Sequence, residues 1–232
     1  MNQKVNQYQQ LIGSYTGKLL RDHFGKGPES ISVSMGGHFV TMYLRNFLTP
    51  SERVLLEQDH EMIIHQMREK LTQMMIPEIT SYIQLVTGVK PSEFYYDWAL
   101  HNKSGMLVGF VPEGFEEAPE VNENYEGKQR LEQEINKISR LVQREPDEIY
   151  SCELNARTIV IIRKGILVRI EKELIRLGHG ELLKGVKRNL EKTYMHNNNN
   201  FDEILNRQVV DSFADWNYSQ DKSVMMLVTQ SK

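Results

Sequence analysis

The stretch Phe94-Tyr95-Tyr96-Asp97-Trp98-Ala99-Leu100 shows how the chain is organised, because Phe-Ala-Asp-Trp at residues 213–216 repeats part of its pattern 118 positions later. The two Asp-Trp pairs contain both tryptophans of the chain. The same offset aligns Pro28 with Pro146 and Ile31 with Ile149. It also aligns apolar positions 42, 44 and 48 with positions 160, 162 and 166. A repeat at one fixed spacing indicates a tandem duplication.

The first copy has the pattern of a helix, a hairpin, a long helix and a second hairpin. Apolar residues recur at helical spacing over 8–24, and glycines followed by Pro28 end that helix. Alternating residues over 30–35 and 39–45 flank a Gly-Gly turn and predict the first hairpin. A helical stripe follows Thr49-Pro50-Ser51-Glu52, and we expect Pro77 to kink or restart that helix.

The second copy repeats this plan, so the sequence predicts an α+β fold. We expect two tandem α-β-β-α-β-β units, each with helices packed on an antiparallel sheet. The first unit spans residues 1–111 and the second spans 128–232. Residues 112–127 are rich in glutamate and lack a basic side chain, which is typical of a solvated, self-repelling linker.

Composition narrows the classes of function. The 232 residues include 28 basic and 31 acidic side chains, so the net charge of −3 offers no global attraction for nucleic acid. A single cysteine and a polar N-terminus favour a cytoplasmic protein, and no apolar run is long enough to insert into a membrane. Residues 157–192 carry ten basic and four acidic side chains. A solvated helix face explains this excess better than a nucleic-acid or membrane patch.

Several motifs have a structural explanation that outweighs the chemical one. Residues 25–28, Gly-Lys-Gly-Pro, end a helix, whereas a phosphate-binding loop would begin one. His60 and His65 are five positions apart on a helix and therefore diverge too far to share a metal ion. Cys152 alternates with apolar residues in a strand and has no nearby activating group in sequence. We expect no metal site, no cofactor and no catalytic residue.

Two charged positions recur in both copies at the offset of 118. Arg45 aligns with Arg163, and Asp97 aligns with Asp215. An arginine–aspartate ion pair that joins the hairpins is the structural interpretation. A charged pair within a ligand cavity is the alternative.

Polar loops found only in the first copy are the main candidates for ligand binding. Residues 21–28 follow the first helix, and residues 101–105 form the turn of the second hairpin. Loops on a rigid scaffold often carry function, and histidine titrates near physiological pH. The candidate ligand-binding residues are Arg21, His23, Lys26, Arg45, Asp97, His101 and Lys103.

Four motifs resemble those of the MpsC family: residues 19–28 (LLRDHFGKGP), 43–48 (YLRNFL), 95–98 (YYDW) and 102–106 (NKSGM). The family takes its name from an accessory component of a cation-linked, membrane-potential-generating system whose other members handle bicarbonate uptake. The resemblance is close over residues 8–111, and the second copy is similar but divergent. It lacks the glycine-rich corner and has a different turn at 219–222.

The resemblance implies a non-catalytic cytoplasmic accessory or regulatory protein at the inner face of the membrane. Its implied partners are the subunits of a membrane transporter, and self-association is a further expectation. The alternative is a domain or enzyme that binds a small anion or nucleotide through the polar loops of the first copy. Binding to nucleic acid through residues 157–192 is a weaker hypothesis.

Overall fold

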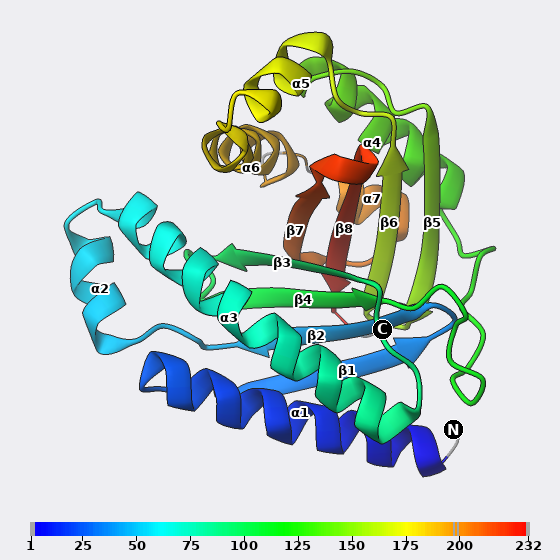
Figure 1. The fold of residues 1–232 in the computed structure, drawn as a ribbon. Coiled ribbons are helices and arrows are strands. Elements are labelled where there is room, and N and C mark those ends of the chain that lie inside the picture. Colours follow the sequence, from blue (N-terminus) through cyan, green and yellow to red (C-terminus); the bar gives the residue numbers. More distant parts are fainter. Residues whose placement is uncertain (1–2, 197, 199, 231–232) are drawn as a thin grey trace. The chain divides into compact units, whose positions relative to one another are not determined.

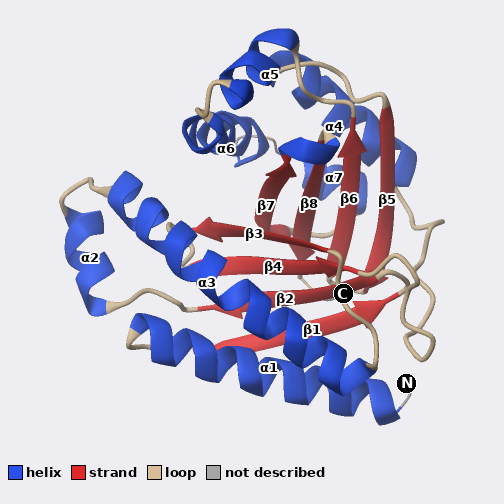
Figure 2. Cartoon of the chain, in the orientation of Figure 1, coloured by secondary structure: helices blue, strands red, loops and turns tan. Residues whose placement is uncertain are grey.

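The computed structural model describes residues 3–196, 198 and 200–230, and the chain divides into two units at residue 120. Each unit has one four-stranded antiparallel sheet with helices against it (Figures 1 and 2). The strand orders are β1-β2-β4-β3 and β5-β6-β8-β7. Both the α+β class and the tandem repetition are therefore confirmed.

The first unit follows the predicted order of elements. Its helices and strands are α1 (Gln3–Phe24), β1 (Ser30–Gly36), β2 (Phe39–Arg45), α2 (Pro50–Glu57), α3 (Glu61–Thr87), β3 (Glu93–Ala99) and β4 (Ser104–Phe110). Gly25 has φ +74°, and its N–H donates to Arg21 O, so this glycine ends α1 as predicted. Pro77 lies within α3, which continues through it, so the predicted restart of the helix at this proline is wrong.

The second unit repeats the plan with one more short helix. Its elements are α4 (Lys128–Val142), β5 (Glu148–Asn155), β6 (Thr158–Lys164), α5 (Arg169–Arg176), α6 (Gly180–His196), α7 (Asn200–Leu205), β7 (Val209–Asn217), a 3-10 turn (Tyr218–Gln220) and β8 (Lys222–Thr229). The sequence Asn-Asn-Asn-Asn at 197–200 predicts a polar loop within the second helical region, but its residues 197 and 199 lie outside the described residues.

The core of the first unit lies between its sheet and the pair α1 and α3 (Figure 1). Tyr15 of α1 stacks on Tyr82 of α3 with ring centroids 3.9 Å apart. Trp98 of β3 is 1% exposed and lies over Gly105 of β4, its partner in the sheet. A Cβ at Gly105 would stand 2.5 Å from two carbons of the indole, so this position requires glycine.

A β-bulge changes the alignment of the two copies. The pairing of β5 with β6 shifts register between Glu153 and Asn155, which gives the second hairpin one more residue than the first. Gly36 pairs with Phe39 at the first turn, and Asn155 pairs with Thr158 at the second. From β6 the structural offset is therefore 119, and it returns to 118 only at β7. A bulge leaves one residue unpaired, and sequence periodicity alone does not reveal its position.

The acidic segment 112–127 contributes an aromatic ring to each core. Phe115 packs into the first core and Tyr125 into the second. Pro119 O accepts the Gly37 N–H at the first hairpin turn, and Asn122 forms a β-bridge with Glu153. Packing and hydrogen bonds thus attach the segment to each unit, whereas its acidic composition is typical of a solvated linker.

Candidate functional site

The structure brings several predicted residues to one end of the first sheet, beside the loop 46–49 between β2 and α2. Lys26 Nζ donates to Leu48 O at 3.1 Å. Lys103, in the β3–β4 turn, accepts the Phe47 N–H through its carbonyl oxygen at 2.6 Å. The chain after α1 and the turn of the second hairpin therefore meet at this loop. We call Arg21, Lys26, Arg45, His101 and Lys103 the basic corner.

The basic corner is open to solvent and mostly cationic. The side chains of Arg21, Arg45, His101 and Lys103 are exposed. His23 lies apart from it, with Nε2 3.9 Å from Glu78 Oε1 on α3. An oxyanion could approach the corner from outside, because its cations are held at the surface rather than in the core.

Asp97 does not join the basic corner. Its side chain is fully buried on β3, and its Oδ1 accepts the Trp98 N–H at 2.7 Å. Arg45 ends β2, two strands away in the sheet order, and its side chain forms no ion pair within the described residues. The predicted Arg45–Asp97 ion pair is therefore wrong.

Beneath the loop lies a buried ion pair between Glu52 of α2 and Arg68 of α3. Both side chains are 0% exposed. Arg68 donates from Nε to Oε1 at 2.7 Å and from Nη2 to Oε2 at 2.8 Å, a bidentate geometry. Glu52 also completes a capping box with Thr49, whose N–H donates to Oε2 at 2.8 Å. The carboxylate thus ties the start of α2 to the middle of α3.

Aromatic rings surround the Arg68 guanidinium. Its central carbon lies 4.7 Å from the ring centroid of Trp98, 4.8 Å from that of Phe47 and 6.0 Å from that of Phe24. Burial alone would raise the pKa of Glu52, but the hydrogen bonds and charge of Arg68 outweigh it and hold that pKa below its usual range. The Glu52 carboxyl is therefore ionised at neutral pH.

The loop connects the buried pair with the basic corner. Arg68 Nη2 donates to Phe47 O at 2.9 Å, while the Phe47 N–H donates to Lys103 O. One residue further on, Leu48 O accepts from Lys26. A ligand that moved Lys26 or Lys103 would therefore also move this loop, in which the Phe47 carbonyl oxygen accepts a hydrogen bond from the buried Arg68.

The second unit holds an equivalent buried ion pair. Lys187 Nζ lies 2.7 Å from Glu171 Oε1, and the two residues are sixteen positions apart, as in the first unit. Glu171 receives the Val168 N–H at the start of α5, and Lys187 lies 5.8 Å from the Trp216 ring centroid. Burial lowers the pKa of Lys187 despite the opposing effect of Glu171. A carboxylate, a cation and a tryptophan are thus kept in both copies.

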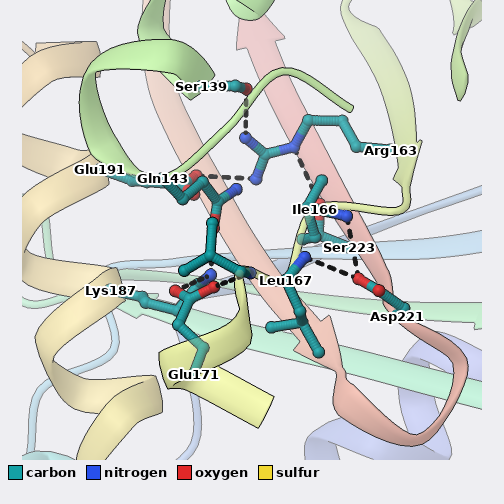
Figure 3. Close-up of polar contacts among 11 residues, drawn as sticks. Ser139, Gln143, Arg163, Ile166, Leu167, Glu171, Lys187, Glu191, Asp221 and Ser223 are labelled. Carbon is teal, nitrogen blue, oxygen red and sulfur yellow. Dashed lines mark hydrogen bonds and ion pairs between the residues drawn. The ribbon is translucent and has the colours of Figure 1, made fainter. Parts of the chain in front are cut away.

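The second unit adds a second buried ion pair, shown in Figure 3. Arg163 Nη2 donates to Glu191 Oε2 at 2.8 Å, and both side chains are 0% exposed. Arg163 also donates to the hydroxyls of Ser139 and Ser223, each at 2.9 Å. The predicted Arg163–Asp215 pair is wrong, because Asp215 instead lies 2.8 Å from Lys184 Nζ.

The first unit has no charge at the places of this second pair. The register of β6 places Arg163 opposite Ser223, where Leu44 faces Gly105 in the first unit. Arg163 therefore corresponds to Leu44 and not to Arg45. At the same offset of 119, Glu191 corresponds to the fully buried Thr72. The buried residues of α1 also recur in α4 at 119, since Ile12, Thr16, Leu19 and Leu20 match Leu131, Ile135, Ile138 and Ser139. Ser139 therefore corresponds to the fully buried Leu20. The fold does not require this ion pair, since the first unit forms without it.

The copies also differ where the basic corner meets the loop. Asp221 occupies the turn position of Lys103, and both residues have positive φ, 48° and 52°. Asp221 Oδ1 accepts the N–H groups of Ile166 and Leu167 at 2.9 and 2.8 Å (Figure 3). Its Oδ2 lies 2.9 Å from Lys172 Nζ. The second unit thus places its own carboxylate where the first unit presents a lysine.

Sequence reasoning missed Glu52, Arg68 and their counterparts. The usable signal was the spacing, since a glutamate and a base sixteen positions apart recur at an offset of 119. The bulge in β5 concealed this offset. Glutamate, lysine and arginine are also rarely buried in proteins, so sequence reasoning places them on the exposed face of a helix.

The remaining motifs lie away from these sites. Cys152 is fully buried, and burial raises the pKa of its thiol to about 11. His60 precedes α3 as an exposed residue, and His65 is half-buried within that helix. Among the described residues, no group of three or more metal-ligating side chains is placed to hold an ion. None of the described helices combines the length and the apolarity needed to cross a membrane.

Comparison with known families assigns both units. Residues 4–111 and 125–231 each match the model described as Na+-translocating membrane potential-generating system (MpsC). The chain belongs to the MpsC family. Neither the curated proteins nor the solved structures include a match to this chain. The tandem MpsC units thus connect the chain with a membrane-potential system.

Proposed function

We propose that this tandem MpsC protein is a non-catalytic accessory or regulatory component of a membrane ion transport system that handles bicarbonate. It acts in the cytoplasm, at the inner face of the membrane, by binding the transporter subunits. The observation that carries the proposal is the family match of both units, which covers nearly the whole chain. The feature that both units share, a buried ion pair beside a tryptophan, joins helices within each unit.

The test is recovery of the protein with its partners from native membranes. A tagged chain is expressed in a strain with the transporter and in a strain that lacks its subunits. We expect the tagged chain to enrich the transporter subunits in the first strain and to be lost from the membrane fraction in the second. Failure to enrich any subunit of an ion transport system would contradict the proposal.

The difference between Asp221 and Lys103 favours a second candidate function, binding of a small oxyanion at the basic corner. In the second unit, a carboxylate satisfies two backbone N–H groups of the loop. In the first unit, the Leu48 N–H corresponds to that of Leu167 and has no acceptor within the described residues. Lys26 and Lys103 adjoin this loop, so an external anion would find cations where the second unit has its own aspartate.

Titration with bicarbonate and with inorganic phosphate, followed by the amide resonances of residues 46–49, tests this second function. The variant Lys103→Asp places the residue of the second unit at the equivalent turn position and should abolish the response. A response of equal size in the variant would rule out the basic corner as the binding site.

A further inference from the structure

The first strand of the first unit, β1, is an outer strand of its sheet (Figure 1). Gly36 and Phe39 close a two-residue turn, so the backbone groups of Gly36 and of every second residue before it bond to β2. The N–H and C=O groups of the residues between them, which include Ile31 and Val33, therefore point away from the sheet. None of these outward groups has a backbone partner within the described residues.

The equivalent strand of the second unit, β5, has a protected edge. An open edge strand pairs readily with another chain, and proteins usually prevent this with charges, proline, a bulge or a covering segment. β5 carries Glu148 and Glu153, and its pairing with β6 contains a bulge. The outward N–H and C=O groups of Glu153 also bond to Asn122, so the acidic segment before α4 covers part of this edge.

Within the described residues, β1 lacks these features. Its sequence, Ser-Ile-Ser-Val-Ser-Met-Gly at 30–36, has no charge and no proline, and its pairing with β2 is regular throughout. Helix α1 packs on one face of the strand, where a Cβ at Gly13 would lie 3.2 Å from Val33 Cγ2. The opposite face carries serines, of which Ser30 and Ser32 are exposed. The first sheet therefore presents an uncovered edge.

We propose that β1 pairs with β1 of a second copy of the same chain, antiparallel and about a twofold axis at Ser32. The pairing is confined to residues 30–34, because Met35 is only 2% exposed. A strand that meets itself about a twofold axis forms an isologous contact, so the product is a closed dimer in which the two sheets are continuous. This contact is independent of the transporter and oxyanion proposals.

The sequence of β1 selects a second copy as the occupant, because its polarity reads alike in both directions about Ser32. Ile31 lies opposite Val33 of the second copy, and the outward N–H and C=O groups of these two residues bond to each other. On the other face, Ser30 lies opposite Ser34, and Ser32 lies opposite itself. Apolar side chains thus meet apolar ones and hydroxyls meet hydroxyls, with no like charges opposed, and such cross-strand pairs stabilise a sheet.

Substitution of Ser32 tests this register directly, since two copies of this exposed side chain lie about 5 Å apart across the axis. Ser32→Lys and Ser32→Glu each bring like charges together and should weaken the association roughly fivefold. An equimolar mixture of the two variants should recover it, because opposite charges then face each other. Ser219→Lys adds the same charge at an exposed position of the second unit and should leave the association unchanged.

Sedimentation velocity of the full chain at rising concentration measures the association, and hydrogen exchange locates it. The strand contact is short, so we expect a weak, reversible dimer. The amides of Ile31 and Val33 should exchange more slowly as the concentration rises, because their outward N–H groups become bonded in the dimer.

Several results would overturn the proposal. One is a chain that remains monomeric up to about 1 mM, even if its edge then binds an extended peptide of another protein. Another is an association in which the exchange of Ile31 and Val33 does not change. Ser32 variants that associate as the wild type does, or whose mixture does not recover the association, would exclude a twofold axis at this residue.

Discussion

The buried Arg163–Glu191 pair can be exchanged for the residues that the first unit uses at the same places. The perturbations are Arg163→Leu, Glu191→Thr and the double variant, which together reproduce Leu44 and Thr72. Arg163→Leu alone leaves the Glu191 carboxylate fully buried without its cation. Removing one partner of a buried pair costs about 3–5 kcal/mol of folding stability.

The double variant removes both charges, so no buried ion is left behind. Replacement of a buried pair by apolar or neutral residues is often neutral or stabilising by about 1–4 kcal/mol. The hydroxyls of Ser139 and Ser223 both lose Arg163 as a donor, while Ser139 Oγ still donates to Ile135 O. We therefore expect the double variant to be at least about 2 kcal/mol more stable than the less stable single variant.

Hydrogen exchange of the β6 and β8 amides is the appropriate assay, because the chain has two units and global unfolding need not be two-state. A triple variant adds Ser139→Leu to the double variant, so that it also carries the counterpart of Leu20, and it provides a second test of the same argument. If the destabilisation of the double variant equals the sum of the single ones, the argument that the fold does not need this pair is refuted.

Three further outcomes follow from the structure. Gly105→Ala should destabilise the first unit by about 1–3 kcal/mol in urea unfolding, because the new Cβ would clash with Trp98. The control Gly17→Ala should not destabilise it, because a Cβ at this helix position has its nearest contact at 3.4 Å. The pKa of Glu52 is lowered in the folded state, so the stabilisation by its carboxylate is present above the unfolded pKa of about 4.3 and is lost as pH falls through the folded value. Glu52→Gln should therefore reduce the loss of unfolding free energy at acidic pH. An unchanged loss in this variant would contradict the lowered pKa of Glu52. The native Cys152 thiol should react with an alkylating reagent at least about a hundredfold more slowly than in denaturant, since its pKa is about 11, and equal rates would show that the thiol is not buried.

Sequence reasoning predicted the fold because the evidence for it is periodic. Alternating strands, helical stripes and the repeated Asp-Trp pair each reflect a regular geometry that recurs in both copies. The basic corner was partly predictable for the same reason, since Lys26 and Lys103 lie in loops at one end of a sheet. Their joint contact with residues 46–49 could not be predicted, because it depends on how the loop folds back over Arg68.

The buried charges were not predictable from pattern alone. Arg163 follows a run of apolar β6 residues, and the offset of 118 predicts that it pairs with Asp215 as Arg45 pairs with Asp97. The bulge in β5 moves it to the inward position held by Leu44 in the first unit. A shift of one residue reverses the face on which a strand residue lies. The two copies therefore share a fold while differing in which charges they bury and which they expose.

Bicarbonate uptake and membrane potential in a strain that lacks only this chain decide whether the chain is an accessory of a membrane ion transport system. If it is, both quantities fall although the transporter subunits remain in the membrane, and re-expression of the chain restores both. Unchanged uptake and potential in the deletion strain would contradict the claim.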